Sequence, residues 1–250
     1  SYCYMKRHMP FSLNVATNTE DILTEINSHA AFAQVDKPNQ THKKYITYDI
    51  SCNEDFALHA KYHEWEKIFK FFKDHPKAMG SFATKYVNPD LIRFNPEGKI
   101  RIRFSLMPQH KADIHEPNTS KIIDRIKAID SFIQSGYDVH VNFSPIIVYN
   151  GWLEDYKYLF SMMNDYVENK DNVLAECIFL THNFERHKYN LEDNPKSEID
   201  LWVPSIQEDK ISQYGGVNRR YNRKLKYQYI KDFVELHDRI IPWNKIRYIF

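Results

Sequence analysis

The chain has 250 residues, of which 42% are hydrophobic and 15% aromatic, and only 6 are glycine. This composition is sufficient for one substantial core and argues against both disorder and a glycine-rich phosphate-binding loop. The 34 basic and 33 acidic residues leave a net charge of +1, so any nucleic-acid-binding surface must be local. Three scattered cysteines exclude a disulfide framework, and no apolar run reaches membrane-spanning length. We therefore expect a soluble protein of the reducing cytoplasm.

Helical and strand patterns alternate along the first two thirds of the chain. In chain order they predict a helix after Asn18, a strand at 45–50, a helix at 65–76, a strand at 81–86, a helical turn at 89–94, a strand at 100–105, a helix at 122–133, a strand at 139–148, a helix at 153–167 and a strand at 177–180. Ile22, Leu23 and Ile26 should form the inner face of the first helix, and Gly136 should cap the helix at 122–133.

Strands that alternate with helices at this spacing build parallel βαβ units. We therefore expect an α/β fold, a partial (β/α) barrel of about six units over residues 1–182. The alternation ends near residue 183. Residues 183–250 are expected to form a C-terminal extension of hairpin and helix that packs on the barrel.

Polar residues follow the predicted strands at the points where they end. In parallel barrels these ends converge on one mouth, where ligands bind. Lys85 is the most informative, because a lysine at an inner strand end is desolvated unless an anion pairs with it. Each residue alone is better explained as an ordinary turn or helix-capping residue, but together they favour a polar cofactor. The set consists of Cys52, Thr84, Lys85, Ser105, Gln109, Asn142, Ser144, Thr181, His182 and Asn183.

A basic segment runs from residue 210 to residue 231 and contains no acidic side chain. Tyrosines alternate with the cations, a combination that suits phosphates and stacked bases. Gly215 and Gly216 allow a tight hairpin in the middle. From composition alone, a solvated basic face is about equally probable. The cations are Lys210, Arg219, Arg220, Arg223, Lys224, Lys226 and Lys231.

The three cysteines have different surroundings in the sequence. Cys177 lies in an apolar strand and is expected to be a small buried hydrophobic residue. Cys52 lies just past a strand end among polar residues, where reactive and structural roles are equally plausible. Cys3 has no second cysteine or histidine at metal-ligand spacing, and the histidines form no HExxH motif.

Several ordered motifs resemble the spore photoproduct lyase family of radical S-adenosylmethionine (SAM) enzymes. Cys3-Tyr4-Met5-Lys6 is similar to the end of the family's C-x-x-x-C-x-x-C motif. Further similar motifs lie at residues 50–53, 82–86, 101–106, 144–147, 151–152, 213–215 and 246–250, so the resemblance covers nearly the whole chain. It implies a radical SAM barrel with a [4Fe–4S] cluster and SAM as cofactors. Cys3 would be the third cluster ligand, and the first two would lie before Ser1 in a longer protein.

The resemblance also implies roles for individual residues. Tyr4, Asn53, Lys85, Ser105 and Ser144 match positions at the SAM site, and Cys52 matches the thiol that returns a hydrogen atom to the product radical. The implied reaction is the reversal of a thymine-dimer photolesion by a 5′-deoxyadenosyl radical. Such a lesion must leave the base stack. The matching DNA-binding hairpin carries Tyr214, Gly215, Gly216, Arg219, Arg220, Tyr221 and Arg223.

The implied partners are DNA with a damaged thymine pair and an electron donor such as flavodoxin or ferredoxin, with the protein acting as a monomer. Two departures from the family pattern indicate a divergent branch: residues 12–17 lack the expected tyrosines, and Asn53 replaces a small hydroxyl residue. The alternatives are a radical SAM enzyme with another substrate and a non-catalytic nucleic-acid-binding relative.

Overall fold

The structure, a computed structural model, describes residues 15–37, 41–50, 54–211 and 215–250. Six parallel strands form a curled half-barrel sheet in the order β1-β2-β3-β4-β5-β9. The fold predicted from the sequence is therefore confirmed. The strands are β1 (Ile46–Asp49), β2 (Ala78–Thr84), β3 (Ile100–Ser105), β4 (Asp138–Ile146), β5 (Leu174–Phe179) and β9 (Lys245–Ile249).

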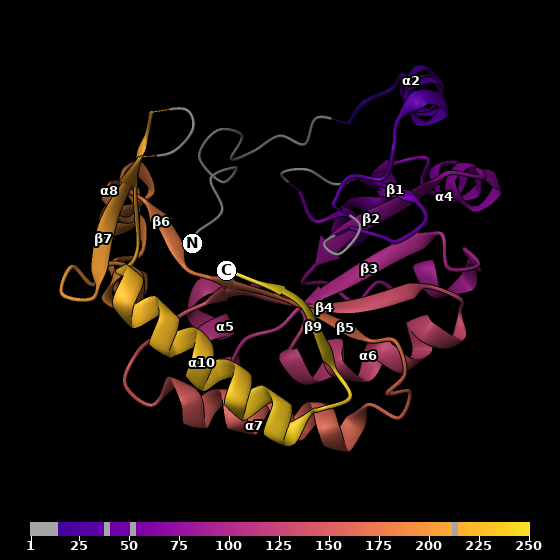
Figure 1. Ribbon diagram of the computed structural model, residues 1–250. Coiled ribbons are helices and arrows are strands. Elements are labelled where there is room, and N and C mark those ends of the chain that lie inside the picture. The colour runs from indigo at the N-terminus through magenta and orange to yellow at the C-terminus, as the bar shows by residue number, and fades with distance from the viewer. Residues whose placement is uncertain (1–14, 38–40, 51–53, 212–214) are drawn as a thin grey trace.

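Helices cover the convex face of this sheet, and α10 (Arg223–Ile240) runs beside α7 (Trp152–Tyr166) (Figure 1). The other helices of the barrel part are α2 (Thr19–Phe32), α3 (Phe56–His59), η1 (Ala60–Tyr62), α4 (Trp65–Asp74), η2 (Leu91–Arg93), α5 (Gln109–His115) and α6 (Ile122–Gln134). Among the described helices, none combines the length and the apolar character that crossing a membrane requires.

A second, antiparallel sheet lies at the end of the molecule opposite α2 and α4 (Figure 1). Its strands follow the order β6-β8-β7, and two short helices, α8 and α9, accompany them. The bounds are β6 (Thr181–Asn183), α8 (Phe184–Asp193), α9 (Pro195–Leu201), β7 (Gln207–Ile211) and β8 (Val217–Tyr221). The predicted hairpin around Gly215 is confirmed, because β7 and β8 pair antiparallel and Gly215 has φ +81°.

The periodicity of the sequence sets which side chains face the helices. In β3, Ile102 and Phe104 face the convex side, where Phe104 packs edge-on against Phe132 of α6 with 5.4 Å between ring centroids. Arg101 and Arg103 alternate with them and therefore face the concave side. β3 thus contributes one apolar face to the core and one charged face to the hollow of the half-barrel.

Two details of the first and third predicted helices bear on this packing. Leu23 of α2 is buried, but Ile22 is exposed, so the assignment of Ile22 to the inner face is wrong. The buried face of α2 is therefore narrower than predicted. Gly136 follows α6 with φ +89°, as predicted for a helix end. A Cβ there would lie 2.1 Å from the Asn95 side-chain oxygen, so a larger residue would have to displace Asn95 and would also be strained at this positive φ.

The C-terminal segment enters the barrel, which the sequence pattern did not predict. Phe233 of α10 is fully buried, and its ring lies 5.2–6.4 Å from those of Tyr156, Phe160 and Trp152 in α7. Residues after α10 then supply β9, the sixth strand. Phe233 therefore joins the C-terminal extension to the barrel core.

We expect Phe233→Ala to lower the free energy of unfolding by about 3–5 kcal/mol, because it leaves a cavity among packed rings. The matched control is Tyr227→Ala in the same helix, since Tyr227 is exposed and its loss should cost at most about 0.5 kcal/mol. Urea unfolding of the two variants measures the difference. Equal losses would contradict the assignment of α10 to the barrel core.

Candidate cofactor site and hairpin

The C-terminal ends of β2 and β3 are fixed by one buried ion pair. Arg125 of α6 is completely buried, and its guanidinium donates to a Glu116 carboxylate oxygen at 3.0 Å and to the Ser105 backbone carbonyl at 2.7 Å. It also donates to the Thr119 hydroxyl and the Ser120 carbonyl, while the Ser120 N–H donates to the Lys85 carbonyl at 3.0 Å. The pair therefore sets the positions of both Lys85 and Ser105.

Asp55 holds the same strand end from the other side. Its carboxylate accepts from the Lys85 N–H at 2.7 Å and the Thr84 hydroxyl at 2.6 Å, and it caps α3 through the Leu58 N–H. Thr84 is thus a structural partner of Asp55. The Asp55 carboxylate therefore links the start of α3 to the end of β2. An aspartate directly before Phe56-Ala57-Leu58 is a helix-capping signal that sequence reasoning missed.

Among the predicted residues that the structure describes, Lys85 and Ser105 lie at the ends of β2 and β3. Thr181, His182 and Asn183 instead form β6 of the second sheet, so their assignment to the same ring of strand ends is wrong. The Lys85 Nζ lies 3.9 Å from a Glu116 oxygen, and its side chain is 28% exposed. Ser105 is buried at the end of β3 and aligns with Asn142 of β4, while Ser144 lies further along β4. Gln109 instead accepts from the Ile122 N–H and serves as a helix cap. Cys3, Tyr4, Cys52, Asn53 and Tyr214 lie outside the described residues.

Among the described residues, the buried Asn142 side-chain oxygen has no hydrogen-bond partner. It lies at the strand ends, beside Ser105 in the register of β3 and β4. An unpaired buried oxygen is costly unless a ligand donates to it. Cys177, in contrast, is fully buried on the convex side, and burial raises the pKa of its thiol. The sequence prediction of an inert, structural Cys177 is confirmed.

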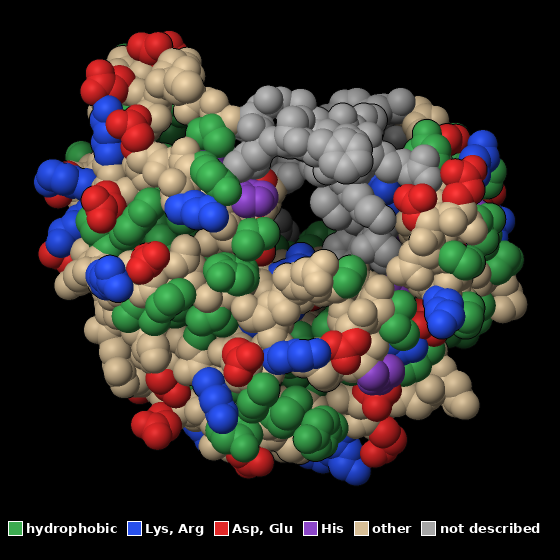
Figure 2. Space-filling model, turned by 180° about the vertical axis from the view of Figure 1, so that it is seen from behind, with side chains coloured by type: hydrophobic (Ala, Val, Ile, Leu, Met, Phe, Trp, Pro, Cys, Tyr) green, Lys and Arg blue, Asp and Glu red, His purple; other side chains and the backbone are tan. Residues whose placement is uncertain are grey.

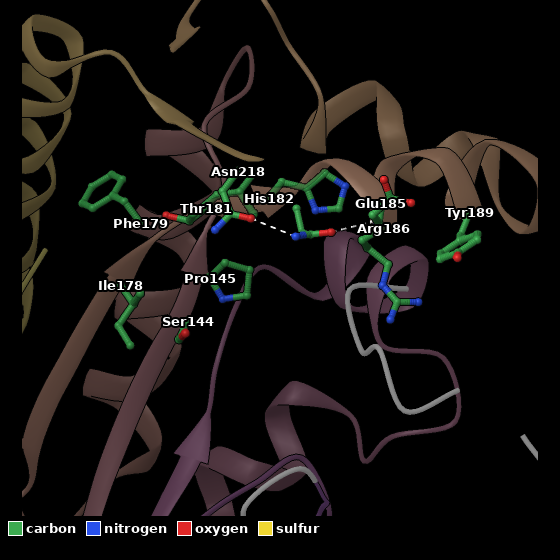
Figure 3. Close-up of a pocket in the computed structure, with 12 residues that line it drawn as sticks. Ser144, Pro145, Ile178, Phe179, Thr181, His182, Glu185, Arg186, Tyr189 and Asn218 are labelled. Atoms are coloured by element: carbon green, nitrogen blue, oxygen red, sulfur yellow. Dashed lines mark hydrogen bonds between the residues drawn. The ribbon is translucent and has the colours of Figure 1, made fainter. Parts of the chain in front are cut away.

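A pocket of about 580 Å³ lies between the mouth of the half-barrel and the second sheet. Figure 3 shows Ser144 and Pro145 on the barrel side, with His182, Arg186 and Asn218 on the other side. Lys85 and Ser105 are not among the described residues that line it. The pocket thus joins one predicted cofactor residue, Ser144, to the strand that carries the hairpin arginines.

The hairpin carries fewer unpaired charges than its sequence indicates. Arg219 and Arg220 of β8 form ion pairs with Asp209 and Glu208 of β7, each at 2.9 Å. Tyr221 is buried, and its hydroxyl accepts from the Val148 N–H at 2.7 Å. The prediction of Tyr221 as a DNA-facing ring is therefore wrong in this arrangement, because the ring supports the hairpin from the barrel side.

Exposed cations nevertheless flank the hairpin. Arg223 and Lys224 begin α10, and Lys210 lies on β7. Lys226 is half-buried, and burial together with the nearby Arg220 and Lys210 lowers its pKa. On the back of the molecule, Figure 2 shows Lys and Arg side chains interspersed with Asp and Glu, so that face carries no broad positive patch among the described residues.

The floor of the half-barrel is a second buried polar cluster that the sequence did not indicate. Glu176 of β5 is fully buried and accepts from Arg103 of β3, Arg247 of β9 and the Tyr248 hydroxyl. Arg103 also pairs with Asp49 of β1 at 3.2 Å. The cluster therefore joins strands from both edges of the sheet and explains how Arg247 and Tyr248 stabilise the barrel.

The chain matches the family model "Spore photoproduct lyase" over residues 1–250. It belongs to the spore photoproduct lyase family. It is 24% identical to spore photoproduct lyase of Bacillus subtilis, covering 99% of this chain and 71% of that protein. The enzyme of a Geobacillus species is 27% identical over 86% of this chain and 62% of its own length. The chain thus spans between three fifths and three quarters of these two relatives.

The fold is that of solved members of this family. The chain superimposes with a TM-score of 0.86 and 20% identity on a spore photoproduct lyase variant with bound AdoMet and dinucleoside spore photoproduct, covering 100% of this chain and 72% of that one. A structure of the enzyme complexed with dinucleoside spore photoproduct gives a TM-score of 0.85 and 21% identity. The family resemblance found in the sequence is therefore confirmed.

Asp138, at the start of β4, contributes a pH-dependent part of the stability. Burial alone would raise its pKa, but hydrogen bonds from His140 and from Arg101, at 3.1 and 2.7 Å, outweigh it and hold the pKa well below the usual range. Stabilisation by Asp138 is therefore complete above its unfolded pKa of about 3.9 and is lost as pH falls through the folded value.

We expect Asp138→Asn to cost about 1.5–3 kcal/mol of unfolding free energy at pH 7, because a charged hydrogen-bond partner is removed. The difference in unfolding free energy between wild type and variant should decrease as pH falls below about 4. Asp74→Asn, at an exposed pair with Lys70, is the control and should cost less than about 1 kcal/mol. A gap that stays constant with pH would refute the lowered pKa.

Proposed function

We propose that this protein is a radical SAM DNA-repair lyase that reverses a thymine-dimer photolesion of the spore photoproduct type. The observation that carries the proposal is the family match over residues 1–250. The relatives are named spore photoproduct lyases, and one solved neighbour holds AdoMet together with the dinucleoside lesion. The proposed partner is DNA with a damaged thymine pair.

The concave strand ends fit the cofactor that this activity requires. When bound, a [4Fe–4S] cluster with SAM supplies a 5′-deoxyadenosyl radical for hydrogen abstraction. Lys85, Ser105 and Ser144 would hold SAM, with Asn142 offering its buried side-chain oxygen to a cofactor N–H or O–H. Tyr4 and Asn53 are proposed as further cofactor contacts, and Cys3 as a cluster ligand.

Two further roles complete the proposal. Cys52, which precedes Asp55 by three residues in the sequence, would return a hydrogen atom to the thymine radical. The pocket between Ser144 and Asn218 would receive the flipped lesion. Flavodoxin or ferredoxin is the proposed electron donor, for a monomer acting in the cytoplasm.

The hairpin and the first turn of α10 are proposed as the DNA contact. Gly215 and Gly216 form the turn, with Tyr214 just before it, and Arg219, Arg220 and Arg223 follow it. The Asn222 side chain accepts from the Leu225 N–H and Glu208 accepts from the Arg223 N–H, so the side chains of Arg223 and Lys224, and not the N–H groups of the first turn, are the proposed phosphate contacts. Arg219 and Arg220 form ion pairs with acidic residues of β7. Arg223 and Lys224 should therefore contribute most to phosphate binding.

The activity is tested with protein expressed from its complete gene, reconstituted anaerobically and supplied with SAM, a reductant and dinucleoside spore photoproduct. We expect release of repaired thymine. Cys52→Ala should still form 5′-deoxyadenosine but should release less repaired thymine, because the thymine radical lacks its hydrogen-atom donor. Lys85→Met should reduce 5′-deoxyadenosine formation at limiting SAM, whereas Lys121→Met, at an exposed pair with Asp113, should not.

The outcomes separate the alternatives. Formation of 5′-deoxyadenosine that the lesion does not stimulate would indicate a radical SAM enzyme with another substrate. DNA binding without any 5′-deoxyadenosine would indicate a non-catalytic relative. Equal effects of Lys85→Met and Lys121→Met would contradict the proposed SAM site.

The DNA contact predicts a change in salt dependence. Arg223→Gln with Lys224→Gln should reduce the slope of log affinity against log salt by roughly 1–2, close to 0.9 for each phosphate that is no longer neutralised. Lys231→Gln, which removes an exposed cation paired with Glu235 two turns further along α10, should leave the slope unchanged. An unchanged slope in the double variant would show that this end of α10 does not bind DNA.

A further inference from the structure

One strand of the second sheet and the two helices that follow it bring two imidazoles and one carboxylate together. They are His182 of β6, His187 of α8 and Glu198 of α9, whose ligand atoms all lie within 4.8 Å of one another. The Glu198 carboxylate lies 3.1 Å from Nε2 of His182 and 2.6 Å from Nδ1 of His187. These residues are 5 and 11 positions apart along the chain, so only the turn from α8 into α9 makes them neighbours.

Burial makes this group unusual. The side chains of His182, His187 and Glu198 are only 2%, 14% and 4% exposed. Within the part of the chain that the structure describes, Glu198 forms ion pairs with these two histidines and with no lysine or arginine. A carboxylate buried without a lysine or arginine partner is costly, and a divalent cation would compensate its charge.

We propose that His182, His187 and Glu198 bind a zinc ion. Two imidazole nitrogens and one carboxylate oxygen are a donor set that zinc accepts, with water completing a tetrahedron. Bonds of about 2.0–2.1 Å place the ligand atoms of such a tetrahedron roughly 3.4 Å apart. The two measured separations, 2.6 and 3.1 Å, are within about 1 Å of that value, so small side-chain shifts suffice.

The surroundings orient the three ligands as outer partners of a metal site do. The Asn190 amide donates to the other carboxylate oxygen of Glu198. The Trp202 ring stacks on His187 at 4.0 Å with an interplanar angle of 9°. The Arg219 guanidinium lies 4.8 Å from the Trp202 ring, which connects the site to the hairpin strand β8.

His182 also lines the pocket between the half-barrel and the second sheet (Figure 3). This position gives the site a route to solvent. An ion here would join β6, α8 and α9 and hold the base of the hairpin in place. The role is structural and separate from the proposed lyase reaction, so it does not depend on that proposal.

A second His–Glu group serves as an internal control. Glu54 contacts His59 at 3.2 Å and His63 at 3.1 Å, but these three side chains are 21%, 29% and 15% exposed. Water can solvate this carboxylate, so it needs no metal. It matches the proposed site in residue types and differs in burial.

The test measures bound metal by mass spectrometry in the whole protein after chelator treatment and addition of Zn²⁺. We expect wild type to retain one equivalent more zinc than Glu198→Gln, and Glu54→Gln to retain as much as wild type. With Co²⁺ as the probe, wild type and Glu54→Gln should show the visible absorption of tetrahedral cobalt, and Glu198→Gln should lose most of it.

His187→Asn provides a second variant in case Glu198→Gln does not fold, because the asparagine amide can occupy the Nδ1 position without binding zinc well. The His187→Asn variant should also bind one equivalent of zinc less than wild type. Equal zinc content in wild type and both site variants would overturn the proposal and leave the three residues as a hydrogen-bonded group. Because metal content is measured without turnover, this result is independent of whether the protein repairs DNA.

Discussion

The buried ion pair between Arg125 and Glu116 is the interaction on which the candidate cofactor site depends. A charged pair removed from water is stable only when every donor and acceptor is satisfied, and Arg125 meets this requirement by donating to the Ser105 carbonyl and to the loop at 116–120. That loop in turn holds the Lys85 carbonyl. The hydrogen bonds of one guanidinium therefore fix the ends of β2 and β3, where Lys85 and Ser105 are proposed to hold SAM.

Ion pairs and hydrogen bonds stabilise the half-barrel on its concave side, and aromatic packing stabilises it on its convex side. Glu176 joins β3, β5 and β9 through Arg103, Arg247 and Tyr248, while Phe233 anchors α10 against α7. Because both sets include residues from the end of the C-terminal extension, α10 and β9 are part of the barrel. The hairpin is consequently carried on a rigid base, which suits an element proposed to enter DNA.

The second sheet connects the proposed chemistry to the proposed DNA contact. Its base contains the His182, His187 and Glu198 group, its residues Thr181, His182 and Asn183 line the pocket that reaches Ser144, and its central strand β8 carries Arg219 and Arg220. The two arginines pair with β7, so their main effect is to stiffen the hairpin. The exposed cations at the start of α10 are left as the groups most available to phosphate.

The sequence by itself determined the family, the alternation of strands and helices through residue 180, and the inert character of Cys177, because these depend on local periodicity and on ordered motifs. It also placed Lys85, Ser105 and Ser144 at strand ends. Only the tertiary structure decided which polar residues support that site: Asp55, Glu116 and Arg125 are distant in sequence, and nothing local marks a buried pair between them. The same holds for Tyr221, whose aromatic character fits base stacking and core packing equally well until its neighbours are known. Burial, the entry of β9 into the sheet and the convergence of His182, His187 and Glu198 are long-range properties, which periodicity along the chain does not encode.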